Sequence, residues 1–283
     1  MITYNPIINT INYNGIDIGV LRLDLIHPEV SGNKWFKLKY NIIQAQLEGK
    51  KGIITFGGAY SNHIAATAFA CKLANVKCIG IIRGDEVTEE NHTLIEAQKN
   101  GMQFIFVSRS LYKQKDSEEY LNELQNKYPE YFIVPEGGNN ELGIKGCEEI
   151  LSIETNKYNT VFCACGTGAT FKGIANSLHS NQKLFGINVL KYEAATDKLN
   201  ATILNHYHFG GYAKHTSELL SFKSNFEITS NIPLDYVYTS KLCFAVFNLI
   251  DKGQITSQDK PLIIHSGGLQ GNLGYESRYK LNV

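Results

Sequence analysis

The sequence predicts an α/β protein with mainly parallel sheets, divided into two lobes around a cleft. Two observations lead to this fold class. Short apolar runs alternate with helical segments from residue 52 to residue 190, which is the spacing of right-handed strand–helix–strand units. The 283 residues are many for one compact core and sufficient for two lobes. Ligands of open parallel sheets bind outside the carboxyl ends of the strands, so we expect the functional residues there.

The expected elements follow from local patterns. Ile-, Val- and Phe-rich runs that end at glycine are typical of buried strands, and apolar residues that recur every three or four positions are typical of helices. Strands are expected at 52–58, 77–84, 102–109, 132–138, 159–166, 183–190 and 261–268. Helices are expected at 35–49, 61–76, 91–100, 116–128, 140–154, 169–179 and 238–253, with another after residue 190. The stretch from about 206 to 235 is expected to be less regular.

The composition narrows the class of protein. Lysine plus arginine and aspartate plus glutamate both number 27, so neither nucleic acid nor an anionic membrane is an expected partner. No apolar run approaches the roughly 20 residues of a membrane span. The start MITYNPIINT has no basic segment before an apolar one, so we expect no signal peptide and a cytoplasmic protein.

The cysteines and histidines are consistent with the expected cytoplasmic location. The six cysteines lie in apolar segments without a Cys-x-x-Cys pair, which predicts buried free thiols in a reducing compartment. No His-Glu-x-x-His motif or Cys/His cluster occurs, so no metal is expected. The histidines of HYH at 206–208 are expected in a surface loop.

Three glycine-rich turns follow predicted strands: FGGAYSN at 56–62, ACGTGAT at 164–170 and HSGG at 265–268. None is GxGxxG or GxxxxGK[ST], so the dinucleotide and mononucleotide fingerprints are missing. In the second turn, Gly166 and Gly168 would let the backbone approach a ligand. Thr167 and Thr170 offer hydroxyls, and the helix that follows presents free N–H groups to an anion such as phosphate. The alternative is a tight turn capped by threonine.

The first turn leads into the predicted helix 61–76. Either Ser61 or Asn62 would serve as the N-cap of that helix. The functional interpretation is that both side chains project from the helix start into a ligand site, where the preceding glycines leave room.

The stretch SGNKWFKLKYN at 31–41 contains three lysines. An apolar stripe is expected on one face of the helix, and a solvated face opposite it would hold Lys37 and Asn41, with Lys39 also at the surface. Lys34 differs, because it follows Asn33, the expected N-cap, and lies in the first turn. Helix dipole and partial burial would lower its pKa and favour a neutral, nucleophilic amine suited to Schiff-base chemistry. The alternative is that Lys34 extends to solvent. The stripe residues are Phe36, Tyr40, Ile43 and Leu47.

A phosphate cradle, a lysine of lowered pKa and a Ser-Asn pair at a helix start together suit pyridoxal 5′-phosphate (PLP). Its aldehyde joins a lysine, its phosphate binds at a helix N-terminus and its ring oxygen takes an amide donor.

The motifs resemble those of the 1-aminocyclopropane-1-carboxylate (ACC) deaminase / D-cysteine desulfhydrase family, PLP enzymes of the tryptophan-synthase-β-like fold type II. GNKWFKLKY resembles the family's GNKxRKLEY, GGAYSNH its GGxQSNH, CGTGAT its GSGGT-like phosphate loop and PEGGNN its PEGGSN. LDYVYTSK and IIHSGG are similar to the terminal DPVYTGK and IHTGG. The segments occur in family order from about residue 20 to 270.

The resemblance implies two three-layer α/β/α lobes, a homodimer, and roles for individual residues. The large PLP-binding domain would comprise 1–35 and 137–283, and the small domain 36–136. Lys34 matches the Schiff-base lysine and the acid/base at Cα. Asn62 matches the donor to the PLP ring hydroxyl, and Thr239 the partner of the pyridine nitrogen. The phosphate loop would be Gly166, Thr167, Gly168, Ala169 and Thr170. The implied substrate-binding residues are Tyr60, Ser61, Asn62, His63 and Tyr238, of which Ser61 lies beside the reacting centre and Tyr238 is the active-site tyrosine.

The sequence also departs from the family pattern. Tyr60 replaces a glutamine, Phe36 an arginine and Ser240 a glycine, and the region 190–235 is shortened. These departures affect the expected substrate more than the cofactor.

The expected function is that of a PLP-dependent lyase acting on a small amino acid, with β-elimination from D-cysteine to pyruvate, ammonia and sulfide favoured. Opening the ring of ACC needs a strongly electron-withdrawing cofactor, which a carboxylate beside the pyridine nitrogen supports. Thr239 and Ser266 occupy the positions where ACC deaminases have glutamate and leucine, although Thr239 could instead only cap helix 240–252. The alternatives are an ACC deaminase forming 2-oxobutyrate and ammonia, and a non-catalytic PLP- or nucleotide-binding protein. A Rossmann dehydrogenase is disfavoured by the missing GxGxxG.

Overall fold

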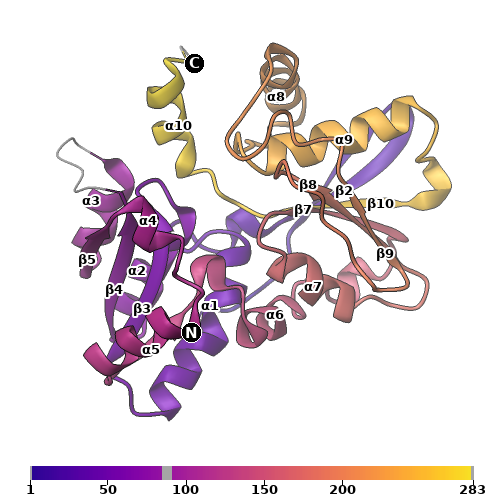
Figure 1. Cartoon of the computed structure of the whole chain (residues 1–283). Coiled ribbons are helices and arrows are strands. Elements are labelled where there is room, and N and C mark those ends of the chain that lie inside the picture. The colour runs from indigo at the N-terminus through magenta and orange to yellow at the C-terminus, as the bar shows by residue number, and fades with distance from the viewer. Residues whose placement is uncertain (1, 85–90, 282–283) are drawn as a thin grey trace.

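The computed structural model describes residues 2–84 and 91–281, in which the strands form two separate sheets. Figure 1 shows the sheets in two lobes with α1 (Asn33–Leu47) between them. The predicted α/β class with mainly parallel sheets is confirmed. The predicted domain ends at residues 1 and 283 lie outside the described residues. No helix in the described ranges is both long and apolar enough to span a bilayer.

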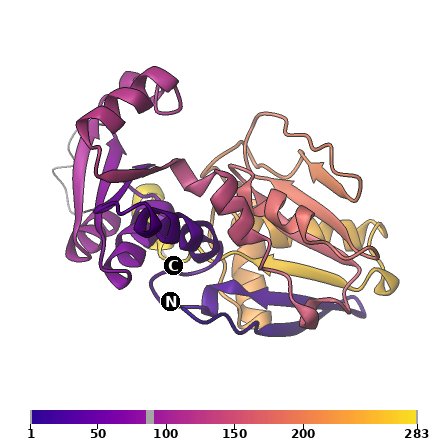
Figure 2. The same ribbon diagram turned by 90° about the horizontal axis from the view of Figure 1, so that it is seen from below.

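The larger sheet has six strands in the order β1-β2-β10-β7-β8-β9. Only the edge pair β1/β2 is antiparallel, and Figure 2 shows this N-terminal hairpin along one side of its lobe. Side chains of β10 alternate between the two faces: Ile263 packs into one core cluster, while Leu262 and Ile264 pack into another. Both faces are therefore covered, as expected for a parallel sheet. The strand bounds are β1 Ile8–Tyr13, β2 Ile16–Arg22, β7 Thr160–Cys165, β8 Lys183–Asn188, β9 Ala201–Leu204 and β10 Pro261–His265.

The smaller sheet has four parallel strands in the order β5-β4-β3-β6. It too is covered on both faces, since Ile53 and Ile54, neighbours on one strand, belong to different core clusters. All four strands were expected from the sequence within a few residues. Their bounds are β3 Gly52–Gly58, β4 Lys77–Arg83, β5 Met102–Val107 and β6 Tyr131–Val134.

The helices pack on these sheets, and α1 contacts both lobes. Trp35 and Leu38 belong to a core cluster of the small lobe, whereas Phe36 packs into the large lobe. The remaining helices are α2 Asn62–Leu73, α3 His92–Lys99, α4 Arg109–Tyr112, α5 Glu118–Lys127, α6 Glu141–Cys147, α7 Ala169–Asn176, α8 Ser217–Ser230, α9 Thr239–Asp251 and α10 Gly271–Tyr279. Short 3-10 turns lie at Leu23–Leu25, Glu136–Gly138, Ile153–Thr155 and Ser257–Asp259.

Several element predictions were wrong. The helix expected at 140–154 ends at Cys147, and β9 rather than a helix follows residue 190. The stretch 206–235, expected to be irregular, contains α8. The hairpin β1/β2 and the last helix α10 were missed. An Asn14-Gly15 pair turns the hairpin with positive φ at both residues, a readable signal between alternating strands. The HYH stretch at 206–208 does lie in a loop, and the six cysteines are buried and free as expected.

The predicted solvated face of α1 was also wrong. Lys37 and Asn41 are buried, with 5% and 0% of their surface exposed, whereas Leu47 of the predicted apolar stripe is 77% exposed. The reason is that two lobes pack on the first turns of α1 and leave little of them to solvent. Asn41 is satisfied there, because its amide donates to the carbonyl of Lys37 at 2.7 Å and accepts from Asn140 at 2.7 Å.

Candidate active site

A cavity of about 400 Å³ lies between the two lobes. Its walls come from the carboxyl ends of β3, β7 and β10 and from the starts of α1, α2, α7 and α9, where parallel strands are expected to place a ligand. Two predicted site residues, Ala169 and Thr239, are fully buried and do not line the cavity. The predicted site residues that line it are Lys34, Tyr60, Ser61, Asn62, His63, Gly166, Thr167, Gly168, Thr170 and Tyr238.

Lys34 is held at the cavity by its neighbour Asn33. Asn33 was predicted to cap α1, but the N-cap is Gly32, and the Asn33 side chain bonds instead to two other residues of the cavity. Its amide donates to Thr170 Oγ1 at 2.8 Å, and its Oδ1 accepts from Lys34 Nζ at 2.9 Å. Burial lowers the pKa of Lys34 to about 7, and the charge of Lys37 lowers it further. The predicted lowering is therefore confirmed, with burial as its main cause.

The glycine loop 166–170 connects β7 to α7. Gly168 is the N-cap of α7 with φ of 96°, and a Cβ built on it would meet no atom within 4 Å. A Cβ on Gly166 would come within 3.1 Å of the Tyr238 ring. The loop therefore leaves open space in front of the N-terminus of α7, the arrangement that binds phosphate groups.

Lys37 is a second lysine of this cavity, which the sequence interpretation placed wrongly at the surface. Its ammonium makes no hydrogen bond or ion pair with any residue in the described part of the chain, and burial lowers its pKa. Lys34 and Lys37 are three residues apart and therefore share one helix face, which is the signal that could have found it. A buried cation without a counter-charge favours an anionic ligand.

The start of α2 supplies the next group of side chains. Ser61 caps the helix by accepting from the N–H groups of His63 and Ile64, so one of the two predicted cap residues is confirmed. Asn62 makes one long hydrogen bond, from Nδ2 to the carbonyl of Gly268 at 3.4 Å. Its buried Oδ1 has no partner among the described residues.

The tautomer of His63 follows from its neighbour. The Thr55 hydroxyl donates to the carbonyl of Val134 at 2.8 Å, so it must accept from His63 Nε2, which also lies at 2.8 Å. His63 Nδ1 is therefore an unprotonated acceptor, buried and without a partner among the described residues. Burial, and then the charges of Lys34 and Lys37, lower the pKa of His63 to about 3, so the ring stays neutral.

Tyr238 and Thr239 lie at the start of α9, where Asp235 organises the backbone. The Asp235 carboxylate accepts from the N–H groups of Val237, Tyr238 and Thr239 at 2.7–2.9 Å. The Thr239 hydroxyl donates to the same carboxylate at 2.8 Å and accepts from the Asp235 N–H at 2.7 Å. Its predicted contact with the pyridine nitrogen therefore stays a prediction.

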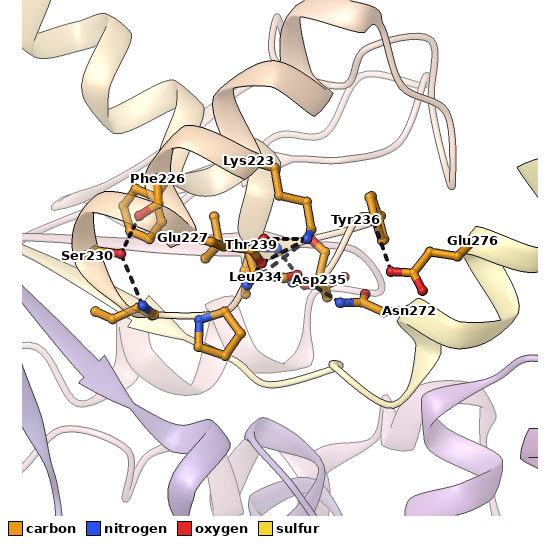
Figure 3. A network of polar contacts seen from close by, with 12 residues as sticks. Lys223, Phe226, Glu227, Ser230, Leu234, Asp235, Tyr236, Thr239, Asn272 and Glu276 are labelled. Atoms are coloured by element: carbon orange, nitrogen blue, oxygen red, sulfur yellow. Dashed lines mark hydrogen bonds and ion pairs between the residues drawn. The ribbon is translucent and has the colours of Figure 1, made fainter. Parts of the chain in front are cut away.

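Figure 3 shows how this segment is anchored from two helices. On the α8 side, Glu227 pairs with Lys223 and accepts from the Leu234 N–H at 2.6 Å. On the α10 side, Asn272 donates to the Leu234 carbonyl at 3.0 Å, and Tyr236 donates to Glu276 at 3.0 Å. The segment that carries Tyr238 is thus fixed before α9 begins.

The sequence interpretation missed further residues that line the cavity, among them Arg83, Glu136, Tyr212 and Arg278. Tyr212 lies at the mouth, 53% exposed, with its ring centroid 6.2 Å from that of Tyr238. Burial raises the pKa of Tyr238 strongly, so this phenol stays protonated. The Gly-Gly pair before Tyr212, in a stretch expected to be irregular, was the available signal.

The fold and the cavity define a class: a two-lobed α/β protein that presents a lysine of lowered pKa and an anion site to a small ligand. The family model for "Pyridoxal-phosphate dependent enzyme" matches residues 9–220, and the chain belongs to this family. It is therefore an enzyme that uses PLP, and the alternative of a non-catalytic binding protein is wrong.

Individual relatives agree with the fold. The chain is 29% identical to a protein of Arabidopsis thaliana named "Bifunctional D-cysteine desulfhydrase/1-aminocyclopropane-1-carboxylate deaminase, mitochondrial", over 91% of this chain and 74% of that protein. A crystal structure described as that of an "ACC deaminase homologue" superposes with a TM-score of 0.82 at 26% identity, over 98% of this chain and 93% of the other. The predicted resemblance and fold type are confirmed.

The residues of the cavity fit PLP. The open space at Gly168 suits a phosphate, and the Lys37 amine, which has no counter-charge among the described residues, would hold a proton more readily beside its negative charge. Asn62 and His63 line the cavity, and each carries a buried polar atom, Oδ1 and Nδ1 respectively, without a partner among the described residues.

Proposed function

We propose that this enzyme catalyses β-elimination from a small amino acid, with D-cysteine as the favoured substrate and pyruvate, ammonia and sulfide as products. One observation carries the proposal. Lys34, whose pKa is lowered to about 7, is joined through Asn33 to Thr170 of the glycine loop, so a nucleophilic amine is fixed relative to a phosphate site.

The roles of the side chains follow from their positions. Lys34 Nζ would attach the cofactor and, once displaced by the substrate amine, take the proton from Cα. When bound, PLP withdraws electrons from Cα. The 166–170 loop, with Lys37, would bind the phosphate, and Asn62 the ring hydroxyl.

The substrate would be bound at the start of α2 and covered by tyrosines. The Ser61 hydroxyl accepts from backbone N–H groups, so its own proton is free to donate to the substrate carboxylate. Tyr60 and His63 line the same cavity. Tyr238 and Tyr212 line the cavity with their rings close together and would exclude water from the reacting centre.

The choice of D-cysteine over ACC depends on the groups that could face the pyridine nitrogen. Among the described residues that line the cavity, the only carboxylate is Glu136, and Ser266 is present where ACC deaminases are expected to have leucine. A neutral hydroxyl, such as that of Thr239 or Ser266, stabilises a protonated pyridine nitrogen less well than a carboxylate does. Elimination at Cβ needs less electron withdrawal by the cofactor, because the leaving group accepts the electron pair. ACC deamination is the second candidate, because the name of the Arabidopsis relative includes both activities.

We also propose the division into a large domain, 1–35 and 137–283, and a small domain, 36–136. All strands of the four-stranded sheet fall within the second range, although α1 crosses the boundary at residue 35. The cytoplasmic location and the homodimer expected from the family stay predictions.

Product analysis tests the proposal. The PLP-loaded protein is incubated with D- and L-cysteine, β-chloro-D-alanine, D-serine and ACC, and 2-oxo acids and sulfide are measured. We expect pyruvate and sulfide from D-cysteine and slow or no turnover of ACC. Formation of 2-oxobutyrate from ACC at a rate equal to or above that of pyruvate from D-cysteine would favour the deaminase instead.

A further inference from the structure

Lys241 is a buried lysine for which the chemistry above has no use. It lies in the first turn of α9 with 0% of its surface exposed, and no carboxylate in the described part of the chain forms an ion pair with it. Its Nζ donates instead to two backbone carbonyls, those of His208 at 2.9 Å and Gly211 at 2.8 Å. Lysine is almost never fully buried unless its charge is compensated, so these two bonds need an explanation.

The two carbonyls belong to one tight loop. The Gly211 N–H donates to the His208 carbonyl at 3.0 Å, and the Lys214 N–H donates to the Gly211 carbonyl at 3.1 Å. Phe209, Gly210 and Gly211 have φ values of 50°, 90° and 110°, a run of left-handed backbone that is unfavourable for the first of them. Because the Lys241 ammonium bonds to both carbonyls, it can stabilise this conformation of the loop.

The residue that follows the loop is Tyr212, at the mouth of the cavity. Its ring faces Tyr238, which lies three residues before Lys241 at the start of the same helix. Helix α9 therefore positions both tyrosines. Tyr238 is its N-cap, and Tyr212 follows the loop that Lys241 binds through two carbonyls.

We propose that Lys241 is a positioning residue that holds Tyr212 over the mouth of the cavity by fixing loop 208–211 to α9. The proposal rests on the proposed function only in that Tyr212 is taken to face the substrate; the contacts themselves do not depend on it.

Hydrogen exchange tests the contacts without any substrate. In Lys241→Met, amide exchange over 206–214 is expected to be about tenfold faster or more in the PLP-loaded protein, while the second half of α9 keeps its wild-type protection. Lys50→Met is the matched control, since Lys50 Nζ also donates to a backbone carbonyl, that of Pro129 at 2.8 Å, outside the cavity. Unchanged exchange over 206–214 in Lys241→Met would overturn the proposal.

A double-mutant cycle tests the path through Tyr212. Lys241→Met alone is expected to lower kcat/KM about tenfold or more, because a misplaced cavity wall orients the substrate poorly. In a Tyr212→Ala background the same change is expected to cost less than about twofold. Equal losses in both backgrounds would show a merely structural lysine and overturn the proposal.

A milder variant covers the case in which Lys241→Met does not fold. Lys241→Gln keeps an amide that can donate to both carbonyls. Its amide exchange over 206–214 and its loss of kcat/KM are expected to lie between those of the wild type and Lys241→Met. Fast exchange over 206–214 together with full activity in this variant would overturn the proposal. If the wild type turns over no amino acid tested, the proposed function fails, whereas the exchange result still decides on Lys241.

Discussion

Replacing Gly32 by alanine should misplace Lys34. Gly32 is the N-cap of α1 and has a φ of 71°, where an added Cβ would lie 1.9 Å from the carbonyl oxygen of Ser266 and 2.8 Å from the Gly267 nitrogen. The Ser266 carbonyl cannot retreat freely. It accepts from the Asn33 N–H at 3.1 Å, and the preceding His265 is held by Asp24 at 3.0 Å and by the Pro233 carbonyl at 2.7 Å.

The size of the effect follows from these distances. A tolerable Cβ contact is about 3.0 Å, so the helix start must move by about 3.0 − 1.9 = 1.1 Å. A displacement of about 1 Å at a reacting group can cost on the order of 10²-fold in rate. Gly32 combines its φ of 71° with a ψ of −151°, a conformation almost restricted to glycine, so an alanine there adds about 1–3 kcal/mol of destabilisation. We therefore expect kcat/KM for the amino-acid substrate to fall about 100-fold, together with loss of the Lys34–Asn33–Thr170 hydrogen bonds and of cofactor retention.

Gly49→Ala is the matched control, since Gly49 follows the other end of α1 with a φ of 65° and no atom within 4 Å of its added Cβ. It should show the backbone cost in chemical denaturation but keep wild-type turnover and bound PLP. Turnover is measured by pyruvate formation, cofactor content by absorbance, and stability by urea midpoint. Gly32→Ala with the activity and cofactor content of Gly49→Ala would refute the steric reasoning.

Three further predictions concern the cofactor site. Lys34 has a folded pKa of about 7 against an ordinary 10.5, so in the cofactor-free protein its labelling by an amine reagent should be half-maximal near pH 7. Stability should also rise with pH between those two values, because only the unfolded chain then holds this proton; a Lys34→Met variant with the same pH slope would contradict the assignment. Lys37→Met should weaken PLP binding about tenfold or more, measured by spectral titration, whereas Lys39→Met, which loses a partly exposed pair with Glu149, should not. Gly168→Asp should likewise weaken PLP binding at least about tenfold, since its carboxylate would occupy the phosphate space; Gly253→Asp, at another left-handed glycine with open surroundings, should leave affinity unchanged.

Much of the site could be predicted because its chemistry lies in short turns. A glycine loop before a helix, as at 166–170, and a Ser-Asn pair at a helix start carry their geometry locally, and the structure places both in one cavity. The pKa of Lys34 could also be given a direction, because a cation in the first turn of a helix is disfavoured whatever its neighbours.

Lys37 could not be placed in this way. Helical periodicity assumes one buried face and one solvated face, whereas α1 is packed from both sides, so a polar residue opposite an apolar stripe is still buried. Tyr212 was missed for a different reason. It depends on a loop held by a lysine 29 positions further along the chain, a contact that no local pattern contains. The N-terminal hairpin and α8 did carry local signals: the Asn14-Gly15 turn for the hairpin, and for α8 the N-cap Thr216, whose side chain accepts from the Leu219 N–H.

The position of α1 between the lobes has a consequence for spectroscopy. The only tryptophan of the chain, Trp35, is the residue after Lys34 and is buried in the core of the small lobe. Its emission therefore comes from a single site beside Lys34, the lysine proposed to attach the cofactor. Energy transfer to bound PLP will quench this fluorescence, so cofactor loading can be followed without a label. The emission wavelength of Trp35 will at the same time report whether solvent reaches the packing between α1 and the small sheet.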